Sequence, residues 1–215
     1  MATKNGVATP RKVVTEAIAA ETKAPEILRI PRPDLKTFSL QIKGISPLMM
    51  HAWSEKVMSG LPGGSGHKDP KTGKRPARDP EKDFREAAYR HPEGGYGFPA
   101  VAFKQAAVSA IRLIDGLTMA EAKLMFLMPQ DFVKIESPEP TMDSRPVRLQ
   151  RGGSVEMRYR PVFWPWSTNL EVRYNARAVT VEQIVNLLVL AGECVGIGEW
   201  RPEKGGKHGR FTIGS

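Results

Sequence analysis

The chain has 215 residues, 40% of them hydrophobic, which is enough for one packed domain with extensions and too few for two. Its 32 lysines and arginines outnumber its 23 aspartates and glutamates, and the formal net charge of +9 favours a polyanionic partner, nucleic acid first among them. The single cysteine, Cys194, excludes a disulfide framework and a thiolate metal cluster, and because no apolar run is long enough to cross a bilayer we expect a soluble, cytoplasmic protein without a membrane partner.

The first 36 residues predict a flexible arm, because they consist of scattered charges, small residues and the element Pro31-Arg32-Pro33. From Thr37 to Ile45 apolar and polar residues alternate with the period of two that is typical of a half-buried strand. We therefore divide the chain into an arm, residues 1–36, and a single domain, residues 37–215.

Residues 59–79 are rich in glycine and proline, which abolish regular structure. Five cations cluster there, namely Lys68, Lys71, Lys74, Arg75 and Arg78. The segment predicts a long, flexible, basic loop. Loops of this length are uncommon inside compact domains unless they are functional or disordered.

Two helices are expected next, over Pro80–Arg90 and over Ala102–Ile114, where the apolar residues of the second helix form one stripe. Phe132–Glu136 is typical of a strand. Pro146–Tyr159 predicts a hairpin that turns at Gly152-Gly153.

The C-terminal part begins with a strand within Val162–Tyr174 and continues with a helix over Thr180–Glu193, which Thr180 and Gln183 open as a capping box. A glycine-rich loop, Gly196–Gly209, leads to a last strand, Arg210–Ile213. Strands and helices that mix without regular alternation predict an α+β fold with an antiparallel sheet and helices on one face.

The glycine-rich loop is the most specific signal in the sequence. Glycines such as Gly196 and Gly198 let a backbone approach a phosphate chain closely. The loop and the residue that follows it also carry four cations, namely Arg201, Lys204, Lys207 and Arg210. We expect an anion-binding loop, with a plain turn between helix and strand as the alternative. It is neither a Walker loop, which would end in Gly-Lys-Ser/Thr, nor a dinucleotide fingerprint, which would follow a strand.

The predicted hairpin is strongly basic over residues 143–161. Its candidate phosphate-binding residues are Arg145, Arg148, Arg151, Arg158 and Arg160. Met157 and Tyr159 could wedge between bases or stack on them. The alternative is an ordinary solvated hairpin.

Two further groups of residues have open roles. Lys104 and Arg112 lie on the helix over Ala102–Ile114, where phosphate contact and a solvated helix face are equally good interpretations. Trp164 and Trp166 could stack on bases, although two tryptophans at such a turn are more often part of a core or of a subunit contact.

Several of these motifs resemble the repeat-associated RAMP superfamily, whose members include CRISPR backbone subunits and guide-processing nucleases. The glycine-rich loop and the apolar helix before it resemble the superfamily's C-terminal motif. Phe38–Leu48 resembles its first strand and the exit from that strand, and Gly97–Arg112 resembles its central helical segment. Separately, the sequence is similar to uncharacterised proteins encoded by bacteriophages, which points to a bacterial or phage-infected host cell.

This resemblance implies a ferredoxin-like core, related to RNA-recognition modules, that binds RNA across its surface. The hairpin at 143–161 would act as a thumb, and the subunits would stack into a helical multimer on the strand. We therefore expect non-enzymatic coating of single-stranded nucleic acid, with RNA favoured and single-stranded DNA as the other ligand. The partners would be the strand, further copies of the chain, or subunits of a larger ribonucleoprotein.

Two alternatives stay open. Some members of the superfamily cut RNA with a histidine near the first strand, and His51 stands where such a residue would, so a metal-independent endoribonuclease is one alternative. His67, His91 and His208 lack metal-ligand spacing, and no cofactor is implied. The other alternative is a phage-encoded subunit mimic or inhibitor that acts on a CRISPR complex.

Overall fold

The computed structural model describes residues 30–52, 79–148 and 155–214. The chain divides into two units, and all the described helices and strands belong to the second, Pro33–Ser215. Its main sheet has four antiparallel strands in the order β4 (Phe126–Leu127), β8 (Ser167–Asn175), β1 (Leu35–Gly44) and β9 (Phe211–Ile213).

Two long helices connect the strands of this sheet. Along the chain, α3 (Val101–Ala110) lies between β1 and β4, and α5 (Val181–Cys194) lies between β8 and β9. The succession β1-α3-β4-β8-α5-β9, together with the strand order, is that of the split βαβ motif in ferredoxin-like domains. The predicted α+β class with an antiparallel sheet is therefore confirmed.

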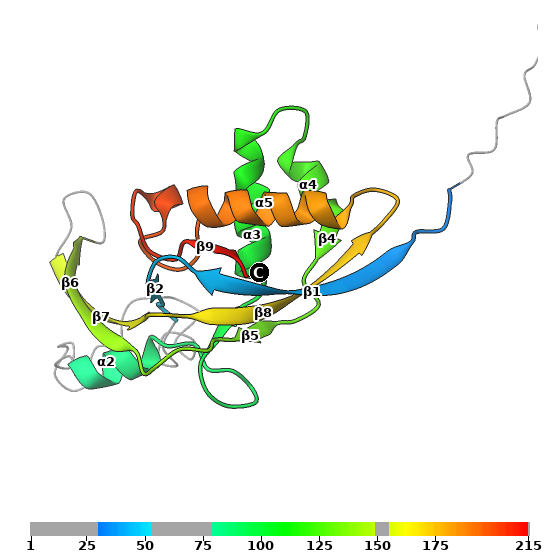
Figure 1. Cartoon of the computed structure of the whole chain (residues 1–215). Helices are drawn as coiled ribbons and strands as arrows, with labels where there is room; N and C mark the ends of the chain where they lie inside the picture. The colour runs from blue at the N-terminus through cyan, green and yellow to red at the C-terminus, as the bar shows by residue number, and fades with distance from the viewer. Residues whose placement is uncertain (1–29, 53–78, 149–154, 215) are drawn as a thin grey trace, which may run out of the picture. The chain divides into compact units, whose positions relative to one another are not determined.

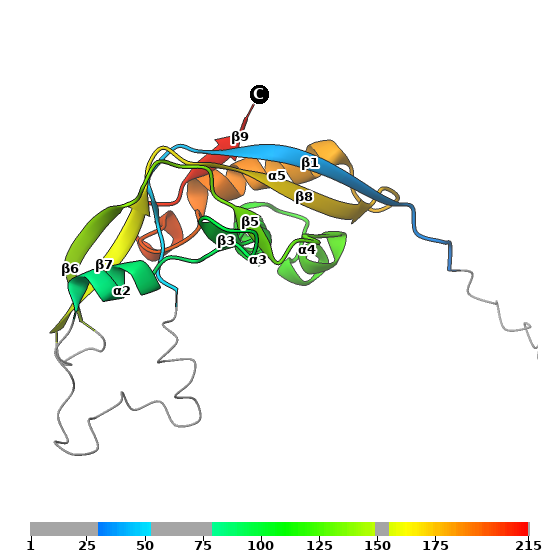
Figure 2. The same ribbon diagram turned by 90° about the horizontal axis from the view of Figure 1, so that it is seen from below.

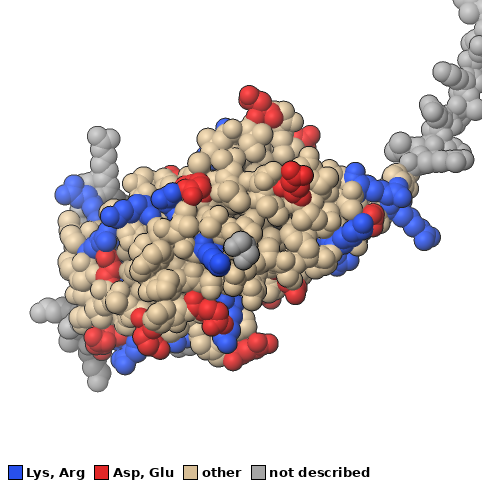
Figure 3. All heavy atoms as spheres, viewed as in Figure 1, with Lys and Arg blue, Asp and Glu red and all other residues tan. Residues whose placement is uncertain are grey.

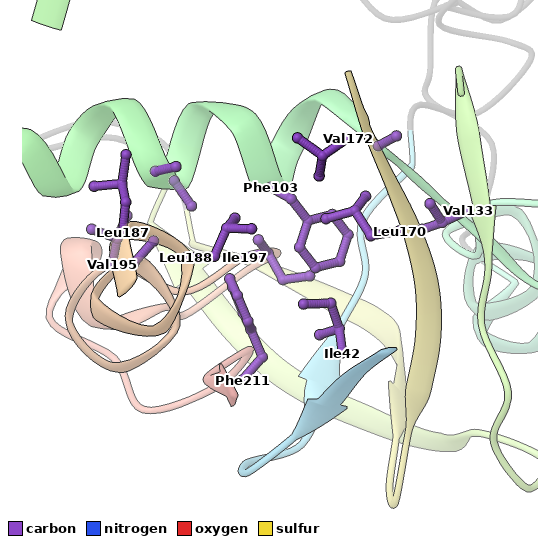
Figure 4. Close-up of a cluster of buried hydrophobic side chains, with 14 of the residues drawn as sticks. Ile42, Phe103, Val133, Leu170, Val172, Leu187, Leu188, Val195, Ile197 and Phe211 are labelled. Atoms are coloured by element: carbon purple, nitrogen blue, oxygen red, sulfur yellow. The ribbon is translucent and has the colours of Figure 1, made fainter. Parts of the chain in front are cut away.

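One face of the sheet is buried, because its central strands alternate between apolar and polar residues. Leu170 and Val172 of β8 and Ile42 of β1 are fully buried, while Asn169 and Glu171 face outward. The buried face packs against α3 and α5 in one continuous core (Figure 4). Helices cover this face of the sheet, as the mixed order of strands and helices predicted.

A second sheet contains the hairpin and has the strand order β2 (Leu48–Met49), β7 (Val155–Phe163) and β6 (Thr141–Arg148). The turn predicted at Gly152-Gly153 lies outside the described residues. Figures 1 and 2 both place this hairpin and α2 (Pro80–Glu86) at one end of the unit and α4 (Met119–Met125) at the other. A short pair, β3 (Gly97–Pro99) with β5 (Phe132–Lys134), completes the strands.

Some boundaries differ from the sequence-based prediction. The helix α2 ends at Glu86, and α3 ends at Ala110, where a 3₁₀ turn, η1 (Ile111–Leu113), continues it. The predicted strand at 162–174 is divided between two sheets: β7 ends before Pro165, which has no N–H for a ladder hydrogen bond, and β8 begins after it. The capping box that opens α5 is present as predicted.

The close contact between α5 and β9 rests on Gly192, which is buried in the helix. A Cβ atom at this position would overlap the carbonyl oxygen of Phe211. We expect Gly192→Ala to destabilise the fold by about 1–3 kcal/mol, although alanine favours helices, because β9 must move away. Urea unfolding followed by circular dichroism measures the change. Asn186→Ala, on the exposed side of the same helix, serves as control and should stay within about 0.5 kcal/mol of wild type.

Candidate nucleic-acid interface

The hairpin presents its charged residues on two different faces. In the β6–β7 register Asp143 lies opposite Arg160 and Arg145 lies opposite Arg158, and these four residues share the inner face. Arg148 lies one position out of this alternation, on the outer face, and is exposed. The predicted hairpin cations therefore form two groups.

The inner-face arginines contact residues from two other parts of the chain. The Arg158 guanidinium lies 3.5 Å from Nε2 of His51, which follows β2. Arg145 lies over the ring of Trp200, with its Cζ atom 5.1 Å from the ring centroid. Arg160 lies 3.9 Å from a carboxylate oxygen of Glu199. Three arginines of the hairpin thus converge on the start of the glycine-rich loop and on His51.

Among the described residues, Arg160 is the buried arginine of the hairpin. Only 1% of the residue is exposed, and its Nη1 donates to Sδ of Met49 at 3.7 Å. Burial lowers the pKa of the guanidinium, although the Glu199 carboxylate opposes this effect. Arg160, predicted as a candidate phosphate-binding residue, is thus buried and joins the hairpin to β2 and to the glycine-rich loop.

The glycines of the loop are required for packing within the protein. Gly196, Gly198 and Gly209 all have positive φ angles, a conformation that favours glycine. A Cβ atom at Gly198 would press on the carbonyl oxygen of Met49, and one at Gly209 would overlap that of Ile197. The loop therefore folds against β2 and against itself, and this packing accounts for its glycines without a bound phosphate.

Carboxylates hold the arginines of the loop and of η1 in place. Arg201 donates to Glu203 through Nε and Nη2, at 3.0 and 2.8 Å, and Arg112 donates to the same carboxylate at 2.7 Å. Burial opposes ionisation of Glu203, but hydrogen bonds to Arg201 outweigh it and lower the pKa. Arg210 is paired with Glu193. These three arginines stabilise the loop's own conformation.

The lysines of the loop remain available for a ligand. Among the residues that the structure describes, no carboxylate lies within ion-pair distance of Lys104, Arg148, Lys204 or Lys207. Lys204 and Lys207 are exposed. Figure 3 shows basic side chains gathered over η2 (Pro202–Lys204) and the neighbouring end of the hairpin. This surface supplies the free positive charge of the candidate interface.

A cleft of about 260 Å³ lies beside this surface, between α3 and the start of the glycine-rich loop. His51, Tyr89 and Glu199 are part of its polar lining, together with Gln105 and Arg201. Burial raises the pKa of Tyr89, and the Glu199 carboxylate adds to this effect, so the phenol is a hydrogen-bond donor at neutral pH. The cleft thus offers both donors and acceptors to a polar ligand.

The tryptophans at the predicted stacking position have opposite environments. Trp166 is 3% exposed and its Nε1 donates to the Ser46 carbonyl at 2.8 Å, so it belongs to the core. Trp164 is 51% exposed. Sequence reasoning missed Trp200, which stands inside the glycine-rich loop and is exposed beside Arg145. Its only signal was an aromatic residue in an otherwise glycine-rich and charged segment.

Other predicted features lie outside the described residues: Arg151 of the hairpin, His67, and all but the last residue of the basic loop at 59–79. In the part of the chain that is described, no three His, Cys, Asp or Glu side chains could together hold a metal ion. Within those same residues, no helix has the length and apolar character needed to cross a membrane.

Comparisons with known proteins return distant structural likenesses. Neither a protein-family model nor a curated protein matches the chain. One chain of the cryo-EM structure of the Type III-B Cmr-beta bound to cognate target RNA is 11% identical, with a TM-score of 0.46 over 85% of this chain and 60% of that chain. The crystal structure of Cmr6 from Pyrococcus furiosus is 11% identical, with a TM-score of 0.45 over 84% of this chain and 99% of Cmr6. This chain therefore spans less than two thirds of the matched Cmr-beta chain.

His208 makes the stability of the loop depend on pH. Burial lowers the pKa of its imidazole, and the charges of Arg145 and Lys207 lower it further. The unfolded chain takes up a proton near pH 6.5, whereas the folded chain does so only at lower pH, so stability should fall as the pH drops below about 6.5. When the pH is lowered from 7.5 to 5.5, we expect the melting temperature of His208→Gln to fall by less than that of wild type. An equal loss in both proteins would contradict this assignment.

Proposed function

We propose that this protein binds single-stranded RNA, without cutting it, along the surface formed by the hairpin and the glycine-rich loop. The observation that carries the proposal is the convergence of Arg145, Arg158 and Arg160 on Trp200, His51 and Glu199. Two basic segments that lie far apart in the sequence thereby form one continuous surface.

Phosphate contacts would provide most of the affinity. Lys204, Lys207 and Arg148 are exposed and have no carboxylate partner among the described residues, so they are free to approach a phosphate chain. Arg145 is held in position by Asp143 at 2.7 Å, and Arg158 by His51. Contacts of this kind fix a strand in place without reading its bases, so we expect little sequence preference.

The strand would not follow the open face of the main sheet. RNA-recognition modules stack bases on aromatic residues of that face. Here the outward residues of the two central strands are polar, charged or aliphatic, as Gln41 and Lys43 in β1 and Glu171 and Arg173 in β8 illustrate, and none of them is aromatic. The hairpin and the glycine-rich loop are therefore the better candidate for the RNA path.

We infer a ferredoxin-like core of the RAMP type, and RNA as the preferred strand, from the motif resemblance together with the strand order of the sheet. The protein would act as a backbone subunit, either coating a strand as a multimer of this chain or serving as one subunit of a larger ribonucleoprotein. Single-stranded DNA is the competing ligand. Absence of binding to any strand at low salt would point instead to a protein partner, such as a CRISPR complex that this chain inhibits.

The first test measures the salt dependence of RNA binding. Replacing Arg148, Lys204 and Lys207 together by alanine should weaken binding about equally across sequences and reduce the slope of log K against log salt by about 0.7 for each lost phosphate contact. The control removes the same charge from α4 and the strands beside it by changing Lys36, Lys123 and Arg173 to alanine. Lys123 lies in α4, Arg173 pairs with Leu127 of β4, and Lys36 pairs with Tyr174 of β8. An unchanged slope in the first variant, or an equal change in the control, would contradict the proposed surface.

A second test varies strand length and looks for cleavage. A coat binds long strands cooperatively, so a 60-nucleotide RNA should bind more tightly per site than a 10-nucleotide RNA and carry several protein copies by light scattering. Equal affinity with one copy per strand would favour a subunit of a larger assembly. The labelled RNA should stay intact in EDTA. Shortened products that disappear in His51→Ala would contradict the non-enzymatic part of the proposal.

A further inference from the structure

Trp200 has a backbone conformation that its side chain does not favour. Its φ angle is +55°, and among the described residues it is the only non-glycine with a positive φ. A bulky residue in this region costs free energy, and such outliers gather at binding sites where the surrounding structure holds them in place. Glycine would adopt the same turn without strain, as it does at Gly198 two residues earlier.

The surrounding loop holds this conformation firmly. The Trp200 carbonyl accepts a hydrogen bond from the His208 backbone N–H at 2.9 Å, and Gly206 packs so closely that a Cβ atom there would overlap the same carbonyl. Both neighbours are anchored by charge, since Glu199 is paired with Arg160 and Arg201 with Glu203. The backbone on each side of Trp200 is therefore fixed.

The indole itself remains 43% exposed, unlike the buried indole of Trp166. The guanidinium of Arg145 lies over its ring, and Asp143 fixes that guanidinium through a hydrogen bond of 2.7 Å. An exposed aromatic ring with a fixed cation against it combines a stacking surface with a charge that attracts phosphate. A ring whose role was only to fill space would be buried.

We propose that Trp200 is a stacking platform for one nucleobase of a bound single strand, with Arg145 as the residue that positions it. The proposal deepens the function proposed above and rests on it. A nucleobase is the occupant that fits, because the surroundings have a net positive charge. Asp143 pairs with Arg145 and Glu199 with Arg160. Among the described residues, however, no carboxylate lies within ion-pair distance of Arg158 on the hairpin or Lys207 on the loop. Stacking tolerates any base, so the site adds affinity without sequence preference.

The experiment compares two fluorescently labelled 20-nucleotide probes, oligouridylate and an abasic strand with the same sugar–phosphate backbone. Wild type should bind the base-bearing strand more tightly than the abasic one. Trp200→Ala should reduce this preference by about 5- to 150-fold, the range that stacking of one base supplies, and Trp200→Phe should keep most of it. Trp164→Ala, which removes another exposed indole, is the matched control and should keep the full preference.

The preference is a ratio within each variant, so a partly unfolded variant still gives a valid result. An unchanged ratio in Trp200→Ala would overturn the stacking site, as would a wild-type protein that binds both strands equally. A change in the oligomeric state of Trp200→Ala, measured without RNA and accompanied by an unchanged ratio, would assign the indole to a protein contact instead. Failure of wild type to bind either probe would refute the proposed function, a result distinct from failure of the stacking site alone.

Discussion

The buried guanidinium of Arg160 is the interaction on which the candidate interface depends. A charge taken out of water must be paired, and among the described residues the carboxylate within ion-pair distance is that of Glu199, 3.9 Å away in the glycine-rich loop. Nη1 of Arg160 also donates to Sδ of Met49 in β2. The hairpin, β2 and the loop are thus joined at one residue. Backbone contacts join the same parts, because the Glu199 N–H donates to the Met49 carbonyl at 2.9 Å and β2 pairs with β7 of the hairpin.

A glycine-rich, basic loop is often interpreted as a phosphate-binding loop. In this structure its glycines and its cations have separate roles. The glycines let the backbone turn and pack against Met49 and Ile197, so they serve the fold. The arginines of the loop, such as Arg201, are held by Glu203. The groups left for a ligand are side chains, namely Lys204 and Lys207, together with the indole of Trp200. A ligand would therefore meet flexible cations and one rigid ring, while several backbone amides of the loop, such as those of Glu199, Gly206 and His208, donate within the protein.

The sequence allowed prediction of the elements that are defined by local periodicity. The alternation in β1 and β8 and the capped apolar stripe of α5 each identify their element from neighbouring residues alone. Strands as short as β2 and β4 have too few residues to show an alternation of apolar and polar side chains. The helix α4 was not predicted, although Thr118 and Glu121 form a capping box at its start. The burial of Arg160 could not be foreseen, because it depends on a carboxylate 39 positions further along the chain (199 − 160).

Among the described residues, Arg112, Arg201 and Arg210 are paired with carboxylates, whereas Lys204 and Lys207 are not. This difference determines the kind of recognition that the surface can achieve. A guanidinium fixed by a carboxylate is oriented, whereas an exposed ammonium on a flexible stem follows whatever phosphate is near. In the proposed function, Lys204 and Lys207 would therefore supply affinity that depends on salt and not on sequence. The carboxylates that fix Arg112, Arg201 and Arg210 also reduce the positive field of the loop. The surface therefore has a rigid arrangement of arginines and only a modest positive charge. Such a surface suits a strand that is held by many weak, repeated contacts better than one that is held at a single tight site.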